Sequence, residues 1–324
     1  MKTRLTKSPA IAADFIRRGE VVAFPTETVY GLGADLFNPS AVARIFAAKG
    51  RPADNPLIAH ISSLDQIQLI ANQPGQAARK LIEAFFPGPL TIVVRKKSVV
   101  PAIATAGLET IGIRMPRHKV ASALITEAGV PLAAPSANAS GRPSPTTWNA
   151  VRDDLDGKIS CILKGDQAEV GLESTVVDCT GAVPAVLRAG AVTLEELRSV
   201  TSRIRIANSD SHDLRRSPGT RYRHYAPRAR VRLVEHPDQA APSNGSAFIG
   251  LTKPKRNAGF EAVKICQAIP DYARSLFSYF RWCDERGIGT IYCEIVPEAG
   301  LGVALMDRLK RAAGIHEDAL HTHP

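Results

Sequence analysis

The stretch FPTETVYGLGADLFNPSAVARIFAAKGRPADNPLIAHI, residues 24–61, decides the fold of the first half of the chain. Apolar residues 21–24 predict a strand that ends at Pro25. A turn rich in hydroxyl groups follows, and Gly31 and Gly33 come directly after it. Because glycine has no Cβ, we expect these two glycines to allow sharp bends of the backbone.

The second half of this stretch predicts a helix and a strand. Asn38 is a suitable N-cap, Pro39 fits the first turn, and Gly50 fits the position after the helix end. The apolar residues 57–61 then predict a second buried strand. Polar side chains thus gather in loops that a helix and two strands hold in place, which is the usual setting of a functional site.

Two motifs in this stretch, PTETVYGLGAD at 25–35 and KGRPADNPL at 49–57, resemble the YrdC-like domain of L-threonylcarbamoyladenylate synthases. Further along, SPGTRYRHYAP at 217–227 resembles the linker of the longer, two-domain members of that family. The resemblance implies an enzyme that condenses L-threonine, bicarbonate or CO₂, and ATP to threonylcarbamoyl-AMP and pyrophosphate. This reaction is the first step of threonylcarbamoyladenosine modification of tRNA.

Composition agrees with a globular protein of one large or two ordinary domains. The chain has 324 residues, of which 44% are hydrophobic. It contains no apolar run of about 18 residues, so no membrane span is expected. The N-terminus has charges where a signal peptide needs apolar residues, and the five cysteines form no CxxC pair. We therefore expect a cytoplasmic protein with reduced thiols.

The net charge of +10 is concentrated in one segment. Nine arginines and two aspartates lie between Arg203 and Arg232, which gives this segment a charge of +7. Two interpretations stay open. The segment is either a solvated linker or a strap that faces phosphates, over a nucleotide or against RNA.

The elements of the first domain predict a mixed sheet. Helices are expected at 10–18, 63–70, 76–86, 119–128 and 147–155, and strands at 90–94, 110–115, 159–163, 173–178 and 185–188. Thr193 and Glu196 form a capping box that predicts the start of the last helix. Because strands and helices do not alternate strictly, we expect a twisted mixed sheet in a YrdC-like α/β domain.

The remaining chain predicts a smaller domain. Strands are expected at 247–251, 262–266 and 290–295, and helices at 269–283 and 300–313, as in a small Rossmann-like α/β domain. The segment 298–302 is no dinucleotide fingerprint. The predicted boundaries are 1–206 for the first domain, 207–230 for a basic linker, and 231–324 for the second domain.

The expected chemistry needs cations and shelter from water more than a covalent nucleophile, because its reactants carry many negative charges. The sequence contains no Walker A motif, nucleophile elbow or kinase signature. Basic residues instead occupy strand ends and loops that contain glycine or serine: Lys49, Arg51, Arg114, Arg142 and Arg188.

The family resemblance implies a role for individual residues. Positions where the family contacts threonine are Thr28, His60, Arg114, Ala134 and Ser174. Positions implied for ATP or the adenylate are Lys49, Arg51, Asn55, Thr110, Ser136, Asn138, Ser144, Arg188 and Tyr225. No catalytic nucleophile and no metal ligand is predicted. Because no cluster of carboxylates offers a metal cage, Mg²⁺ is expected to arrive with ATP.

Two alternatives remain from other lines of reasoning. The basic composition fits a non-catalytic double-stranded RNA-binding protein, although no RNP-like aromatic motif is present. A carbamoyl-adenylating domain of hydrogenase maturation has the same fold, but those proteins carry zinc-finger segments that this chain lacks. The expected partners are the machinery that transfers the threonylcarbamoyl group to tRNA and, as a further hypothesis, RNA itself. No membrane partner is expected.

The linker at 217–227 is not built like a passive tether. It combines two prolines, two tyrosines and several basic side chains. We expect it to fold across the mouth of the first domain as a lid, with Tyr225 reaching the nucleotide.

Overall fold

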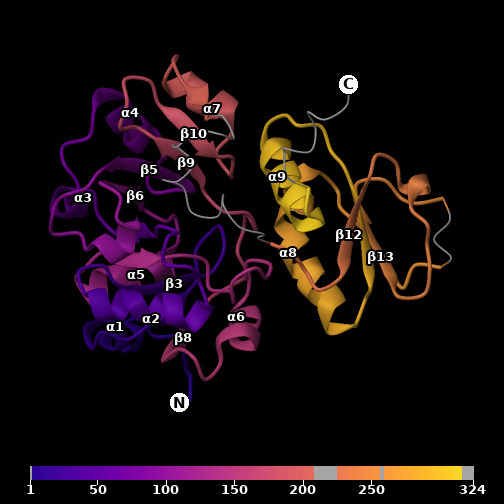
Figure 1. The fold of residues 1–324 in the computed structure, drawn as a ribbon, viewed down its shortest axis with the longest axis horizontal. Coiled ribbons are helices and arrows are strands. Elements are labelled where there is room, and N and C mark those ends of the chain that lie inside the picture. The colour runs from indigo at the N-terminus through magenta and orange to yellow at the C-terminus, as the bar shows by residue number, and fades with distance from the viewer. Residues whose placement is uncertain (1, 208–224, 256–258, 316–324) are drawn as a thin grey trace.

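The computed structural model describes residues 2–207, 225–255 and 259–315. These residues form two α/β parts that lie side by side in Figure 1. The first part contains an eleven-stranded sheet, and the second contains a four-stranded sheet.

The first part follows the order of the predicted elements. Its strands are β1 (Arg4–Thr6), β2 (Val22–Phe24), β3 (Gly31–Asp35), β4 (Ile58–His60), β5 (Leu90–Arg95), β6 (Thr110–Arg114), β7 (Leu132–Ala134), β8 (Cys161–Leu163), β9 (Thr175–Asp178), β10 (Ala185–Arg188) and β11 (Arg205–Ile206). Its helices are α1 (Pro9–Arg17), α2 (Pro39–Lys49), α3 (Asp65–Ile70), α4 (Gln76–Phe85), α5 (Lys119–Ala128), α6 (Trp148–Leu155) and α7 (Leu194–Val200), with a short 3-10 helix η1 (Ala102–Thr105).

The strand order of the first sheet is β1-β8-β2-β3-β7-β4-β6-β5-β9-β10-β11. Parallel pairs such as β4 with β6 stand beside antiparallel pairs such as β4 with β7. The mixed sheet that the sequence predicts is therefore confirmed. This arrangement brings the ends of β2, β4, β6, β7 and β10, and the start of β9, toward one region.

The predicted ends of two helices are also confirmed. Asn38 accepts a hydrogen bond from the backbone N–H of Ala41, and Gly50 ends α2 in the left-handed conformation with φ 60°. Thr193 and Glu196 form the capping box at the start of α7. Local capping chemistry alone specified these positions.

The expectation of sharp bends at Gly31 and Gly33 is wrong. Both glycines lie inside the regular strand β3, which pairs antiparallel with β2. They are needed because the Phe24 ring lies against the strand. A Cβ at Gly31 would stand 2.9 Å from this ring, and a Cβ at Gly33 would stand 2.8 Å from it. The two glycines therefore provide room for a neighbouring side chain rather than a turn.

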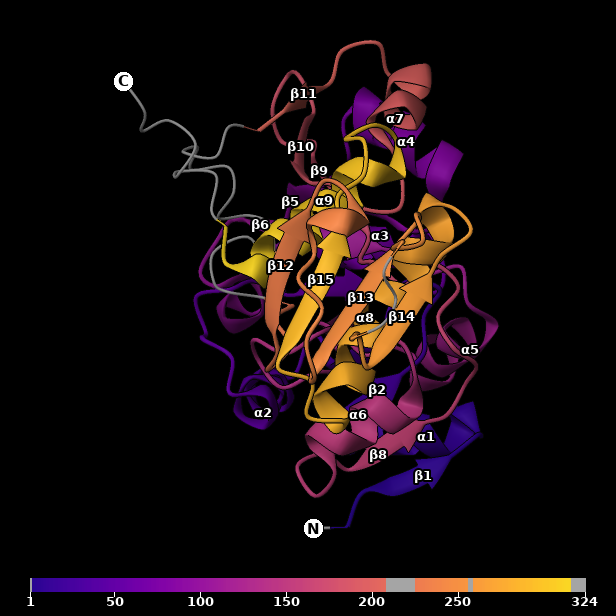
Figure 2. The same cartoon turned by 90° about the vertical axis from the view of Figure 1, so that its right-hand side faces the viewer.

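The second part is the expected small α/β domain. Its strands are β12 (Arg230–Val234), β13 (Ser246–Gly250), β14 (Ala262–Ile265) and β15 (Thr290–Glu294), and its helices are η3 (Pro237–Gln239), α8 (Ile269–Glu285) and α9 (Leu301–Ala313). The strands pair in parallel in the order β12-β15-β13-β14. Figures 1 and 2 show α8 and α9 between this sheet and the first part of the chain.

The two parts share a buried interface. Val29 and Leu172 from the first part belong to the same apolar cluster as Phe277 and Phe280 of α8. A Cβ at Gly171 would stand 2.5 Å from the Cα of Arg274, so the backbone here approaches α8 as closely as a glycine permits. The second part thus packs directly on loops of the first.

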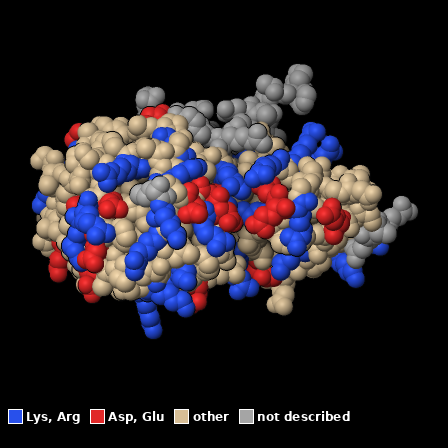
Figure 3. Space-filling view, turned by 90° about the horizontal axis from the view of Figure 1, so that it is seen from below, with Lys and Arg blue, Asp and Glu red and all other residues tan. Residues whose placement is uncertain are grey.

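Part of the predicted linker lies outside the described residues. This applies to 208–224, and so to most of the basic segment and to most of the lid predicted at 217–227. On the face shown in Figure 3, the basic side chains are interspersed with acidic ones. In the portion of the chain that is described, no helix is both long and apolar enough to cross a bilayer.

Candidate active site

A pocket opens where the loops after β2 and β7 meet the ends of β4, β6 and β10. Ten residues that the resemblance implies for substrate binding line it: Thr28, Arg51, His60, Arg114, Ala134, Ser136, Asn138, Ser174, Arg188 and Tyr225. Four others, Lys49, Asn55, Thr110 and Ser144, do not line it. The pocket also contains side chains that the sequence reasoning missed, above all Thr26 and Glu173.

One end of the pocket is built around Arg114 at the end of β6. Its guanidinium lies 2.7 Å from the Glu27 carboxylate, and both side chains are buried. Burial raises the pKa of Glu27, but the charge of Arg114 and its hydrogen bond outweigh this and hold the pKa below its usual value. Glu27 thus stays ionised and fixes Arg114 at the pocket wall.

His60, in β4, is a neutral imidazole. Burial, with a smaller contribution from the charge of Arg114, lowers the pKa of His60 to about 3. Its Nδ1 lies 3.2 Å from the carbonyl oxygen of Ile58. Because a carbonyl can only accept, Nδ1 carries the proton in this contact, and Nε2 is left as an acceptor.

Hydroxyl groups line the same end. The Thr26 and Thr28 hydroxyls lie 2.9 Å apart, and Thr26 also donates to the carbonyl of Val29 at 2.6 Å. On the opposite side, the Ser174 hydroxyl lies 2.8 Å from that of Thr91 in β5. The motif that contains Thr28 also contains Thr26, so the sequence carried a signal for this residue.

Arg188 enters the pocket from β10, whose register with β9 shifts between Val186 and Arg188. Its Nε and Nη2 donate to the carbonyl oxygen of Ser174 at 3.2 and 2.9 Å. The chain behind it is tightly packed, since a Cβ at Gly190 would stand 2.3 Å from the backbone nitrogen of Thr175. The local register shift and the glycine together place this guanidinium at the pocket wall.

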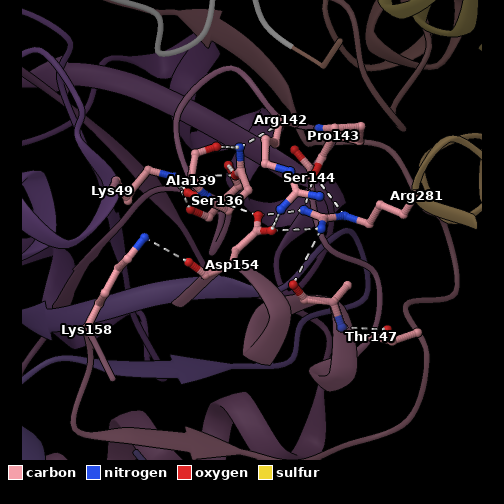
Figure 4. Close-up of polar contacts among 12 residues, drawn as sticks. Lys49, Ser136, Ala139, Arg142, Pro143, Ser144, Thr147, Asp154, Lys158 and Arg281 are labelled. Atoms are coloured by element: carbon pink, nitrogen blue, oxygen red, sulfur yellow. Dashed lines mark hydrogen bonds and ion pairs between the residues drawn. The ribbon is translucent and has the colours of Figure 1, made fainter. Parts of the chain in front are cut away.

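Lys49 does not face the pocket, although its motif suggested a phosphate contact. Its ammonium donates to the carbonyl oxygens of Ser136 and Asn138, at 2.7 and 2.5 Å (Figure 4). Burial lowers the pKa of Lys49 well below its ordinary value. Lys49 therefore holds the loop from which Ser136 and Asn138 line the pocket.

The same loop is held from its other side by Asp154 of α6. Asp154 accepts the backbone N–H of Ala139 at 3.1 Å and pairs with Arg142. It also forms an ion pair of 2.8 Å with Arg281 of α8 (Figure 4). Arg281 donates in addition to the carbonyl oxygen of Pro143. A residue of the second domain thus helps to fix this wall of the pocket.

Arg51 and Asn55 contain buried polar atoms without a partner among the described residues. These are Nε of Arg51 and both side-chain atoms of Asn55, Nδ2 and Oδ1. Burial lowers the pKa of Arg51 to about 10, and the nearby charge of Arg188 contributes to this. Buried polar atoms are almost always hydrogen-bonded in folded proteins, so unpartnered ones at a pocket indicate a place for a polar ligand.

Tyr225, the first described residue after 208–224, closes the pocket on the side of the second domain. Its ring is buried, and it stacks on Phe277 of α8 with centroids 5.4 Å apart. Its φ of 68° is unusual for a residue other than glycine. Such backbone strain often accompanies functional positions.

Ser144 and Thr110 do not line the pocket. The Ser144 hydroxyl donates to the Glu173 carboxylate at 2.6 Å, so Ser144 acts on a pocket residue rather than lining the pocket. Thr110 is buried at the start of β6, the strand that ends with Arg114.

The pocket is therefore lined by three arginines, a neutral imidazole and several hydroxyls. Glu173 is its one carboxylate among the described residues. Cations of this kind bind carboxylates and phosphates, and arginine can do so with two parallel hydrogen bonds. The arrangement suits a small polar ligand with a carboxylate that is bound next to a polyphosphate.

Comparison with known proteins identifies the family. Residues 14–190 match the protein family described as "Telomere recombination", and residues 192–314 match the family described as "Threonylcarbamoyl-AMP synthase, C-terminal domain". The threonylcarbamoyl-AMP synthase of Pyrococcus abyssi is 45% identical over 317 residues, which cover 94% of this chain and 93% of that protein. The enzyme of the same name from Bacillus subtilis is 41% identical, with 95% and 94% covered.

Comparison with solved structures supports the same family. The P. abyssi Sua5 protein, solved in complex with L-threonine, superposes with a TM-score of 0.88 at 41% identity and covers 97% of both chains. A hydrogenase-maturation protein, HypF, shares the fold of the first domain at 17% identity and a TM-score of 0.50, which leaves that alternative without support beyond the fold. The alternative of a non-catalytic RNA-binding protein is not favoured either. This chain belongs to the threonylcarbamoyl-AMP synthase family.

Proposed function

We propose that this chain condenses L-threonine, bicarbonate or CO₂, and ATP to threonylcarbamoyl-AMP in the pocket described above. The observation that carries the proposal is the set of three pocket-lining arginines, Arg51, Arg114 and Arg188, together with the unpartnered buried atoms of Arg51 and Asn55. The relatives named threonylcarbamoyl-AMP synthase and the threonine complex of the P. abyssi protein support it.

Threonine is assigned to the end that contains Arg114 and His60. The Arg114 guanidinium, already oriented by Glu27, would bind the threonine carboxylate. The hydroxyls of Thr28 and Ser174 would bind polar groups of threonine, and Ala134 would contribute backbone and space. The unprotonated Nε2 of His60 would accept a hydrogen bond from the threonine amine or hydroxyl.

The nucleotide is assigned to the other end. Arg51 and Arg188 would stabilise the charge on the phosphates as the carbamate attacks the α-phosphate and pyrophosphate leaves. Ser136 and Asn138 would contact the same groups, from the loop that Lys49 holds. Asn55 would supply hydrogen bonds through its unpartnered amide, and Tyr225 would cover the nucleotide.

Magnesium is proposed to arrive with ATP. The pocket carboxylate, Glu173, already has one oxygen bound to Ser144 and the other to an arginine. Hard cations prefer oxygen ligands, and phosphate oxygens would be the available ones here. The described residues fit a cation that the substrate carries, and these residues would provide no cage for it.

The product would then pass to the machinery that modifies tRNA, and we infer that the protein acts in the cytoplasm. The predicted lid at 217–227 would retain the labile carbamate and adenylate until this transfer.

The test is direct. The purified chain is incubated with ATP, magnesium, threonine and bicarbonate, and pyrophosphate and the adenylate are measured. Pyrophosphate release is expected to require threonine and bicarbonate together. Equal release with serine in place of threonine, or without bicarbonate, would contradict the proposal.

A further inference from the structure

Arg308 of α9 is completely buried, although it belongs to the second domain and carries a full charge. Figures 1 and 2 show α9 on the face of the second sheet that is turned toward the first domain. A buried arginine at a domain boundary is costly unless each part of its guanidinium is matched by a partner.

Two of its partners, Glu173 and Tyr225, line the active-site pocket. Nε forms an ion pair of 2.8 Å with the Glu173 carboxylate. Nη2 donates to the carbonyl oxygen of Ala189, the residue after Arg188, at 3.0 Å. The guanidinium carbon also lies 5.3 Å from the centroid of the Tyr225 ring, a distance typical of a cation–π contact. Nη1 forms an ion pair of 2.6 Å with the carboxylate of Asp307 of the same helix.

Of these partners, Glu173 is affected most by the charge of Arg308. Burial raises the pKa of its carboxyl, but the charges of Arg308 and Arg188 outweigh burial, and its pKa stays below the ordinary value. Glu173 is therefore an ionised carboxylate beside a pocket proposed to bind a polyphosphate. Without Arg308, this charge would repel the phosphates and would attract Arg188, whose guanidinium is needed by the nucleotide.

We propose that Arg308 is a positioning residue for the nucleotide, through which the second domain completes the pocket of the first. It neutralises Glu173, limits the attraction of Arg188 to that carboxylate, and supports the ring of Tyr225. The inference rests on the proposed function, because it assigns the nucleotide to the Arg188 end of the pocket. It gives the second domain a role in the reaction that takes place in the first.

The experiment compares Arg308→Met with the double variant Arg308→Met/Glu173→Gln. Pyrophosphate release is measured against ATP and against threonine, and thermal unfolding shows which variants are folded. For Arg308→Met, the KM for ATP is expected to rise on the order of tenfold, while the KM for threonine changes less than about threefold. The double variant should recover most of the affinity for ATP, because the repelling charge is gone.

Two controls separate this role from general loosening of the interface. Lys310→Met removes a charge from the same helix, where Lys310 pairs with Glu298, and should leave both KM values unchanged. Arg281→Met breaks the other buried interdomain ion pair, and Glu173→Gln should not rescue it. Should Arg308→Met not fold, Arg308→Gln, which keeps a hydrogen-bond donor for Glu173, replaces it with the same expectation.

A pH series adds a second readout. Arg308 is the largest cause that holds the pKa of Glu173 low, so this pKa should be higher in Arg308→Met, and the carboxylate should become neutral at a higher pH than in the unmodified chain. The ratio of the ATP KM of this variant to that of the unmodified chain should therefore decrease as the pH falls. Equal changes in both KM values, no rescue by Glu173→Gln, or a ratio independent of pH would overturn the inference. Failure of the proposed function would look different, because the unmodified chain would then show no release dependent on threonine and bicarbonate.

Discussion

Arg51→Met distinguishes an effect on nucleotide binding from an effect on the stability of the fold. Arg51 is proposed to contact phosphate, and its Nε has no partner among the described residues. Its Nη2 donates to the carbonyls of Asn55 and Pro56 at 3.4 and 3.2 Å. Methionine has a similar length and no charge, so it fills the space and removes the guanidinium alone.

Activity should fall without a loss of stability. Loss of one charge-assisted hydrogen bond costs about 1.5–3 kcal/mol, which corresponds to a loss of about tenfold to hundredfold in kcat/KM for ATP. Burial lowers the pKa of Arg51 from its ordinary value to about 10 on folding. A folded pKa below the unfolded one means that the charged form is destabilised by folding, here by about 3 kcal/mol at neutral pH.

Two weak hydrogen bonds to the carbonyls offset about 2 kcal/mol of this penalty. Arg51→Met is therefore expected to be as stable as the unmodified chain, or more stable by about 1 kcal/mol, while it loses most of its activity. The assays are pyrophosphate release as a function of ATP concentration and chemical denaturation at pH 7. A variant that keeps its activity, or one that loses stability along with activity, would refute this account of Arg51.

Three further predictions concern other parts of the molecule. Arg281→Met should lower the free energy of unfolding by about 3 kcal/mol in a denaturation experiment, since it leaves Asp154 buried with Arg142 as its remaining arginine; an unchanged midpoint would show that this pair contributes nothing. His60→Gln should be less sensitive to acid than the unmodified chain. Because the folded pKa of His60 is about 3, only the unfolded state takes up a proton below about pH 6.5. The free energy of unfolding of the unmodified chain should therefore fall by up to about 1.4 kcal/mol per pH unit relative to that of the variant; parallel stability curves would contradict this. Deletion of 217–227 should abolish or strongly weaken activity while both domains remain folded, and ATP with threonine should protect this segment from proteolysis; full activity after deletion would reduce it to a spacer.

Local chemistry made much of the fold predictable from sequence. Asn38 and Gly50 delimit α2, and Thr193 begins α7, because capping requires only neighbouring residues. The glycines of β3 were misinterpreted for the opposite reason. Their role depends on the Phe24 ring across the sheet, and no local pattern reveals which side chain lies against a strand.

Residues of the candidate site could be predicted from the sequence where they belong to a motif. The motifs pointed to Arg51, which lines the pocket, and to Asn55, which does not line it but also has unpartnered buried atoms among the described residues. Lys49 belongs to the same motif, yet its ammonium binds two carbonyls of a loop nearly ninety residues further on. Glu173 was missed because its importance comes from Arg308, a residue of another domain. Contacts that join distant segments cannot be inferred from the spacing of residue types alone.

The pairing of Glu173 with Arg308 also has a consequence for how the protein is made. The two residues are 135 positions apart, and α9 is the last helix among the described residues. At typical rates of synthesis, Glu173 is made roughly seven to twenty-seven seconds before its partner exists. During that interval the nascent first domain exposes a carboxylate that has no counter-charge from the second. The active site can therefore reach its final form only after α9 has been synthesised, and chains that end before α9 should fold into an incomplete pocket.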